Sequence, residues 1–146
     1  MANLDAVKVK VQQMLSTNLN NVQLTKNGGF NVRHGSSRVF VEVEEWAEKY
    51  TLVKVEVPVL FDVPRSPELY EYIAFHAGQF VFGTLFLRAD DEDAREVSVV
   101  LEHNVLGDYL DEPELMEAVL MLAYVADQID DELKARFGGE RFHEDG

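Results

Sequence analysis

The chain of 146 residues contains no cysteine. This absence excludes disulfide bonds, thiolate zinc sites and cysteine nucleophiles. No serine stands in a G-x-S-x-G elbow, and the glycine pairs lack the strand–helix context of a phosphate-binding loop. Histidine is scarce, and its positions show no HExxH or paired metal-binding spacing: His34, His76, His103 and His143. We therefore expect a non-enzymatic protein with no catalytic residues, no metal site and no cofactor.

Basic residues are also few. The chain has 13 lysines and arginines against 27 aspartates and glutamates, which gives a net charge of -14. The basic residues do not cluster, and a negative field repels phosphate backbones and anionic lipid headgroups. We expect no binding to nucleic acid or to a membrane. The charge agrees with two readings: plain solubility, or a partner that carries basic segments.

Long apolar runs are missing as well. No run reaches the roughly 18 residues of a membrane-spanning helix, and the opening MANLDAVKVKVQQM lacks the apolar core of a signal peptide. We therefore expect a cytoplasmic protein. The length is typical of one domain, so residues 1–146 are predicted to form a single domain, with 140–146 as a flexible tail.

The longest predicted element is a helix from Asp111 to Gly139. Asp111 and Glu114 form a capping box at its start, and Gly138 is placed for a C-cap. Apolar residues recur at helical spacing: Leu115, Val119, Leu122, Ala126, Ile129 and Leu133. Between residues 115 and 126 the helix is apolar almost all round, so this part needs more than one packing partner.

The middle of the chain predicts strands. Apolar and polar side chains alternate in 38–45, 50–61 and 95–105, the pattern of a sheet with one face on a core and one toward water. Pro58 suggests an edge position or a bulge. The segment 80–88 is apolar on both faces, which predicts a strand covered on both sides. Its alternation assigns Phe80, Phe82 and Phe86 to one face, and Val81, Leu85 and Leu87 to the other.

Two shorter helices complete the pattern. An amphipathic helix is predicted near 3–16, and a second begins at Ser66-Pro67 and ends before Gly78. The predicted fold class is α+β: a single antiparallel sheet packed with three helices, in the order helix, strands, helix, hairpin, helix.

Two acidic groups are candidate cation sites. The turn at 90–93 lacks the spacing and the distal glutamate of a calcium loop, so a solvated hairpin turn is favoured. Asp127, Asp130 and Asp131 share a helical face, but no histidine three or four residues away completes a ligand set. A solvated helix face explains them better.

Two segments carry a resemblance to a known family. The order of elements, with PVLFDVPRSPELYEYI before the second helix and ADQIDDELKARFGG near the end, resembles the YbjN-like proteins, which have the fold of type III secretion chaperones. The most specific parts are 63–69 and 130–139. The resemblance implies a small, acidic, non-enzymatic and often dimeric protein that holds an unfolded segment of a partner on apolar patches. It implies no catalytic residues.

Surplus apolar surface is the remaining clue to function. Three segments need a second packing partner: the helix at 115–126, the segment 80–88 and the strand end at 57–61. The two shorter helices, an identical chain or a peptide client could supply it. We expect a chaperone-like, peptide- or protein-binding homodimer. The candidate residues for a client or dimer surface are Leu60, Tyr72, Phe80, Phe82 and Phe86. The alternative is a regulator that senses a small molecule between the sheet and the last helix.

Overall fold

The computed structural model describes residues 3–35 and 37–141. Its elements, in chain order, are α1 (Leu4–Asn18), β1 (Gln23–Leu24), β2 (Phe30–His34), β3 (Ser37–Trp46), β4 (Tyr50–Pro64), α2 (Pro67–His76), β5 (Thr84–Arg88), β6 (Glu96–Leu106) and α3 (Glu112–Phe137). The predicted fold class is confirmed: three helices pack with one antiparallel sheet.

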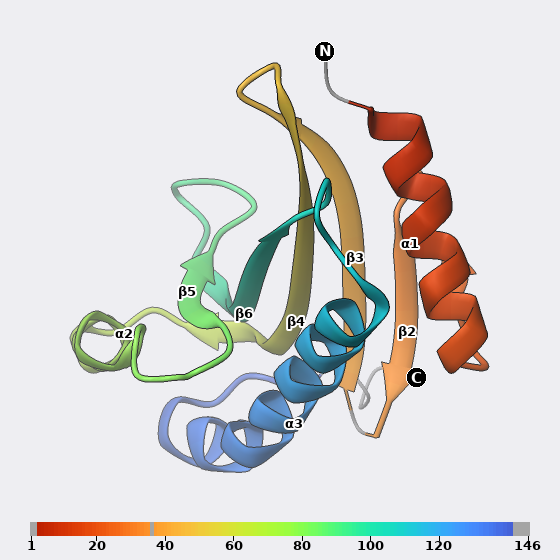
Figure 1. Cartoon of the computed structure of the whole chain (residues 1–146). Helices are drawn as coiled ribbons and strands as arrows, with labels where there is room; N and C mark the ends of the chain where they lie inside the picture. Colours follow the sequence, from red (N-terminus) through yellow and green to blue (C-terminus); the bar gives the residue numbers. More distant parts are fainter. Residues whose placement is uncertain (1–2, 36, 142–146) are drawn as a thin grey trace.

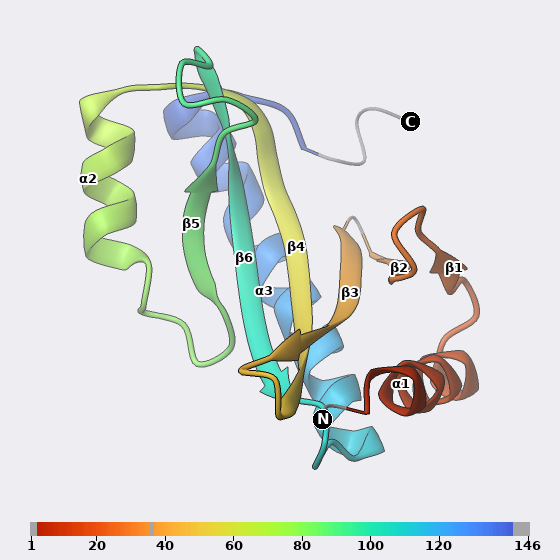
Figure 2. The ribbon, with the colours of Figure 1, turned by 90° about the horizontal axis from the view of Figure 1, so that it is seen from above.

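The sheet has six strands in the order β1-β2-β3-β4-β6-β5, and every neighbouring pair is antiparallel. Figure 1 shows α1 and α3 on the same face, with α3 crossing β4 and β3. From above, α2 lies beside β5 at the edge of the sheet (Figure 2). None of the described helices covers the opposite face.

The core lies between the sheet and α3. Val53, Val55 and Val57 of β4 are fully buried on the helix-covered face. Leu115, Val119 and Leu122 of α3 are fully buried against them. Burying a side chain of this size stabilises the fold by about 1.5–3 kcal/mol, so this contact dominates the packing.

The second partner of the apolar front half of α3 is α1. The buried face of α1 consists of Val7, Val11 and Leu15, and this helix packs beside α3 over β3. The remaining side of α3 stays accessible, since Tyr124 is 57% exposed. Part of the predicted surplus is therefore met within the chain.

β4 bends at a bulge. The pairing of β4 with β6 shifts register between Pro58 and Leu60 and again between Leu60 and Val63. Asp62 has a left-handed backbone (φ 56°) in the same stretch. The bulge turns the consecutive residues Val59 and Leu60 both toward the core. Both explanations predicted for Pro58 hold: the register with β6 shifts just after it, and the pairing of β4 with β3 reaches only as far as Glu56, so Pro58 lies on a local edge.

The predicted strand at 80–88 is shorter than expected. β5 begins at Thr84, and Gly83 before it has φ 95°, which breaks the extended backbone. The expected alternation therefore fails: Phe82 lies beside His103 on the helix-covered face, whereas Phe86 lies on the open face. Leu85 is buried as expected from the opposite parity.

The helix ends follow the predicted caps. The Ser66 hydroxyl accepts a hydrogen bond from the Leu69 amide at 3.1 Å, and the Asp111 carboxylate accepts one from the Glu114 amide at 2.9 Å. Gly138 (φ 83°) ends α3. In residues 3–35 and 37–141, no helix is both long and apolar enough to cross a membrane.

The segment 140–146, predicted to be a flexible tail, begins with a paired residue. Glu140 exchanges two backbone hydrogen bonds with Phe61, at 2.8 and 2.9 Å. Residues 142–146 lie outside the described residues.

Substituting Gly83 tests the packing that ends β5. A Cβ at Gly83 would lie 2.6 Å from Leu122 Cδ1 and 2.9 Å from Leu101 Cγ. Gly83→Ala is expected to lower the free energy of unfolding by at least about 2 kcal/mol, through backbone strain and overpacking. The matched control is Gly78→Ala, where nothing lies within 4 Å of the added Cβ; a change within about 0.5 kcal/mol is expected there. Urea unfolding measures both, and equal losses would contradict this account.

Candidate functional site

A cleft opens between the end of β6 and the first turns of α3. It has a volume of about 350 Å³ and is lined by Phe82, His103, Val105, Pro113, Glu114, Glu117 and Ala118. The cleft exists because the edge strand β5 is shorter than its neighbour β6. β5 pairs only with residues Ser98 to Glu102 of β6, whereas β6 continues to Leu106.

The last residues of β6 form a free strand edge. The backbone amide of Leu85 in β5 points away from β6 and donates to Ala77 O, at 3.0 Å. Leu101 lies opposite Leu85. Its backbone N–H and C=O groups therefore point toward β4 rather than toward β5. At the other end of β6, the Gly107 amide donates to Thr51 O of β4, at 2.9 Å.

Along a strand, the backbone N–H and C=O groups of successive residues point to alternate sides. Because those of Leu101 and Gly107 point toward β4, those of Asn104 and Leu106 point to the β5 side. No strand in the described part of the chain pairs with them there. An unpaired edge of this kind is a template for another strand.

Aromatic and aliphatic groups form the floor of the cleft. The rings of Phe82 and His103 meet edge to face, with centroids 5.5 Å apart. Val105 and Ala118 line the cleft beside them. Burial lowers the pKa of His103 below its ordinary value of 6.5, so the ring is neutral at neutral pH. The floor therefore suits an apolar side chain.

The rim of the cleft is acidic. Glu114 and Glu117 are exposed and lie three residues apart on α3, so their side chains share one face of the helix. Within the described residues, neither carboxylate forms an ion pair, and no lysine or arginine lines the cleft. The cleft thus combines an apolar floor with a negative rim.

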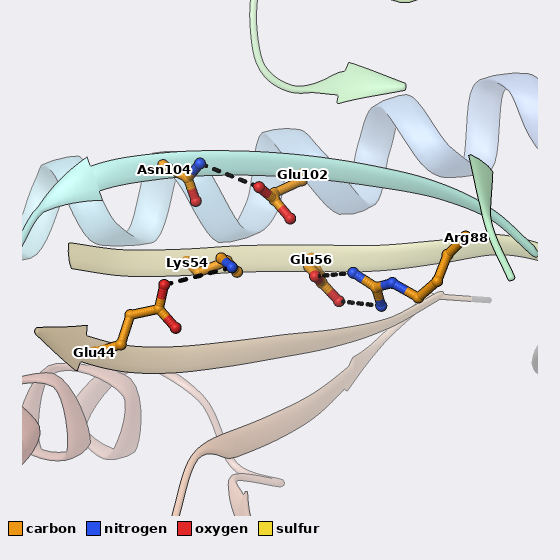
Figure 3. Close-up of polar contacts among 6 residues, drawn as sticks. All are labelled: Glu44, Lys54, Glu56, Arg88, Glu102 and Asn104. Atoms are coloured by element: carbon orange, nitrogen blue, oxygen red, sulfur yellow. Dashed lines mark hydrogen bonds and ion pairs between the residues drawn. The ribbon is translucent and has the colours of Figure 1, made fainter. Parts of the chain in front are cut away.

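The open face of the sheet is polar and internally paired (Figure 3). The Arg88 guanidinium donates two hydrogen bonds to Glu56, at 3.0 and 2.5 Å, and so spans β6 from β5 to β4. Lys54 lies 3.5 Å from Glu44, and the Asn104 amide donates to Glu102 at 3.1 Å.

The ion pair shifts both of its members toward the charged form. Burial alone would raise the pKa of Glu56, but the hydrogen bonds and charge of Arg88 outweigh it and hold this pKa below its ordinary value. The bond to Glu56 raises the pKa of Arg88. The middle of this face therefore offers paired charges, and its exposed apolar residues, Trp46 and Leu106, lie at one end.

The five residues predicted for a client or dimer surface do not form one surface. Leu60 is fully buried inside the chain, because the β4 bulge turns it inward. Tyr72 packs against Phe137 near the end of α3, with ring centroids 5.5 Å apart. Phe80 packs on the core, and Phe86 lies on the open face under Arg88. Phe82 lines the cleft.

Sequence reasoning missed the other lining residues. The spacing of the histidines singles out no role for His103, and the sequence pattern gives Glu114 only a role in the helix cap. The signal that could have found the cleft is Gly83, since a glycine inside a predicted strand often marks its interruption.

A second cavity, of about 470 Å³, lies between α2 and the end of α3 and is lined by Glu68, Glu71, Tyr72, Phe75, His76 and Arg136. Its charges are mixed, and the Arg136 guanidinium is engaged with the Tyr72 ring, 4.9 Å from the centroid. This arrangement specifies no ligand chemistry.

Two of the three aspartates singled out on α3 have protein partners. Asp127 accepts a hydrogen bond from the Ser37 hydroxyl at 2.7 Å, and Asp131 pairs with Arg141. Asp130 is buried, which raises its pKa. In the described ranges, no three His, Asp or Glu side chains gather closely enough to share a metal ion.

A protein-family model matches this chain. The family model TY-Chap1, described as T3SS (YopN, CesT) and YbjN peptide-binding chaperone 1, matches residues 4–145. The match covers nearly the whole chain and confirms the resemblance found in the sequence. Among curated proteins, none matches this chain.

The pKa of His103 predicts a pH dependence of stability. Because this pKa is lowered in the folded state, the unfolded chain binds the proton first as the pH falls. The stability that neutral His103 contributes is present above about pH 6.5 and is lost as the pH falls through the folded-state value. His103→Gln is expected to lose less stability than the unmodified protein between about pH 7 and about pH 5. Urea unfolding at the two pH values measures this loss. His34→Gln, at an exposed strand end, is the control, and an equal pH dependence in all three proteins would contradict the assignment.

Proposed function

We propose, since this chain belongs to the TY-Chap1 family of peptide-binding chaperones, that it holds an extended segment of a partner protein in the cleft between β6 and α3. The observation that carries the proposal is the coincidence of a free strand edge with an apolar cleft. Asn104 and Leu106 supply the edge, and Phe82, Val105 and Ala118 line the cleft beside it.

The two features suit an extended chain in complementary ways. Main-chain hydrogen bonds to a sheet edge give affinity for any extended peptide, and pockets for alternate side chains give specificity. A segment lying along Asn104 and Leu106 would continue the line of β5. Every second side chain would then point to the helix-covered face and into the cleft. One leucine or phenylalanine buried there would contribute about 1.5–3 kcal/mol.

We infer that binding is the whole of the activity, without catalysis or cofactor, and that it takes place in the cytoplasm. The family description names peptide binding. The cleft itself contains one histidine and two carboxylates, with no nucleophile beside them.

A homodimer is part of the proposal. Tyr70 and Phe75 of α2 are 44% and 78% exposed, on a helix at the outer edge of the sheet. The two residues lie five apart and so on different sides of α2. Phe75, the more exposed of the two, suits an isologous contact in which the same helix of a second copy packs against it. This surface is separate from the cleft.

The second candidate is a small-molecule sensor that uses the same cleft. Its volume of about 350 Å³ lies within the range of ligand pockets, about 300–1,000 Å³, and His103 offers one polar group. A ligand at 100 times its dissociation constant would stabilise the protein by about 2.7 kcal/mol in a thermal-shift screen. The peptide is favoured because a small ligand would leave the β6 edge unused.

Binding of labelled peptides with alternating leucine and serine tests the leading proposal by fluorescence anisotropy. Asn104→Pro removes the amide donor that faces the free edge, and proline is tolerated where that amide faces solvent. It is expected to weaken binding by up to roughly tenfold, the worth of the one hydrogen bond that is lost. Asn104→Ala keeps the donor and should bind like the unmodified protein.

A second variant tests the floor of the cleft. Phe82→Asp is expected to abolish binding because it places a charge where the apolar side chain would lie. Leu24→Asp is the control, since Leu24 is 67% exposed on β1, at the opposite edge of the sheet. Urea unfolding confirms that each variant is folded. Absence of peptide binding to the unmodified protein, or equal binding by Phe82→Asp, would refute the proposal.

The dimer has its own test. Phe75→Glu is expected to convert a dimer to a monomer in size-exclusion chromatography with light scattering, because it buries an unpaired charge at the contact. Tyr124→Glu, at a 57% exposed position on α3, is the control. A monomer before any substitution would end this part of the proposal.

A further inference from the structure

We propose that the segment held in the cleft is basic as well as apolar: one apolar side chain enters the cleft, and a lysine or arginine two residues away pairs with Glu114 or Glu117. This inference rests on the proposed function and adds the chemistry of the partner to it.

The charged residues that line the cleft are acidic. Glu114 and Glu117 line the cleft and, within the described residues, have no ion-pair partner. The first turn of α3 also carries Glu112. No described cation lines the cleft, and His103 at its floor is held neutral by burial. A cationic side chain would therefore meet attraction without an opposing charge.

The spacing of alternate residues on a bound strand is similar to the spacing of Glu114 and Glu117 on α3. Residues two apart on a strand lie about 7 Å from each other on the same face. Glu114 and Glu117 are neighbours on one helix face, about 5–6 Å apart at Cβ. When the apolar side chain of the bound segment occupies the floor, the residues two positions before and after it point to the same face. A long cationic side chain at either position would then come near the carboxylates of Glu114 and Glu117.

The side chains on the other face of the bound segment would meet a different surface. Its side chains would point toward the open face of the sheet, where Glu56 is already bonded to Arg88 and Glu102 to Asn104 (Figure 3). The positive charge of Arg88 acts on both of these carboxylates, so they gain less from another cation than Glu114 and Glu117 do. Selection for basic residues therefore acts on the side chains that point to the cleft, and this separates it from general attraction to a protein of net charge -14.

Three soluble peptides test the inference by fluorescence anisotropy. Each alternates serine with one central leucine, and the two residues that flank the leucine on the same face are lysine, serine or glutamate. The lysine peptide is expected to bind roughly three- to tenfold more tightly than the serine peptide, as two exposed ion pairs would give. The glutamate peptide is expected to bind most weakly. The preference should shrink as salt rises.

Charge reversal at the rim provides the matched comparison. Glu117→Lys is expected to reverse the order of the lysine and glutamate peptides, and Glu117→Gln to remove the difference between them without adding a charge. Asp93→Lys makes the same change of net charge in an exposed turn, away from the residues that line the cleft, and should preserve the order.

The outcomes separate the two proposals. If none of the three peptides binds, the proposed function fails. If all three bind equally well, peptide binding stands and the basic specificity is wrong. If Asp93→Lys reduces the preference as much as Glu117→Lys does, the attraction belongs to the whole protein and the inference is overturned.

Discussion

The packing of α3 across β4 is the contact on which the rest of the structure depends. Three valines of β4 and three apolar residues of α3 are fully excluded from water at this contact. A sheet with helices on one face only must place its whole core there. The position of α3 then determines which parts of the sheet stay accessible: α1 fills the side over β3, and the end of β6 remains open beside the first turns of α3.

In the middle of the opposite face of the sheet, one apolar residue is buried without a helix. Val100 of β6 is only 1% exposed, although no described helix covers it. In register it lies between Pro58 of β4 and Phe86 of β5, and the Arg88–Glu56 pair spans the same stretch of β6. We infer that the Arg88 stem and the neighbouring Pro58 and Phe86 rings cover the valine; the Arg88 side chain is itself 45% exposed, whereas that of Glu56 is only 16% exposed. The apolar area that this face still exposes lies at one end, where Trp46 is 53% and Leu106 is 40% exposed.

Gly83 connects the core to the candidate site. It lies so close to Leu122 and Leu101 that a side chain would overlap them. Its left-handed backbone interrupts the extended chain just before Thr84, so β5 begins there and not earlier. The same feature leaves the last residues of β6 unpaired and directs Phe82 into the cleft. The tight packing of one glycine thus produces both halves of the proposed binding surface, the edge and the floor.

The sequence by itself determined the class of fold, the caps of α2 and α3 and most of the core. These depend on local chemistry and on periodicity: Ser66 and Asp111 cap the helices that follow them, and the valines of β4 alternate as a half-buried strand must. The segments quoted for the family resemblance also led to the correct family.

Only the tertiary structure decided where the surplus apolar residues lie. The β4 bulge turned Leu60 into the core, and the break at Gly83 separated Phe82 from Phe86, which alternation had placed together. Neither event is visible in periodicity, because each depends on atoms distant in the chain, such as Leu101 and Leu122. The cleft itself follows from the unequal lengths of two paired strands, a property that no single segment of sequence contains.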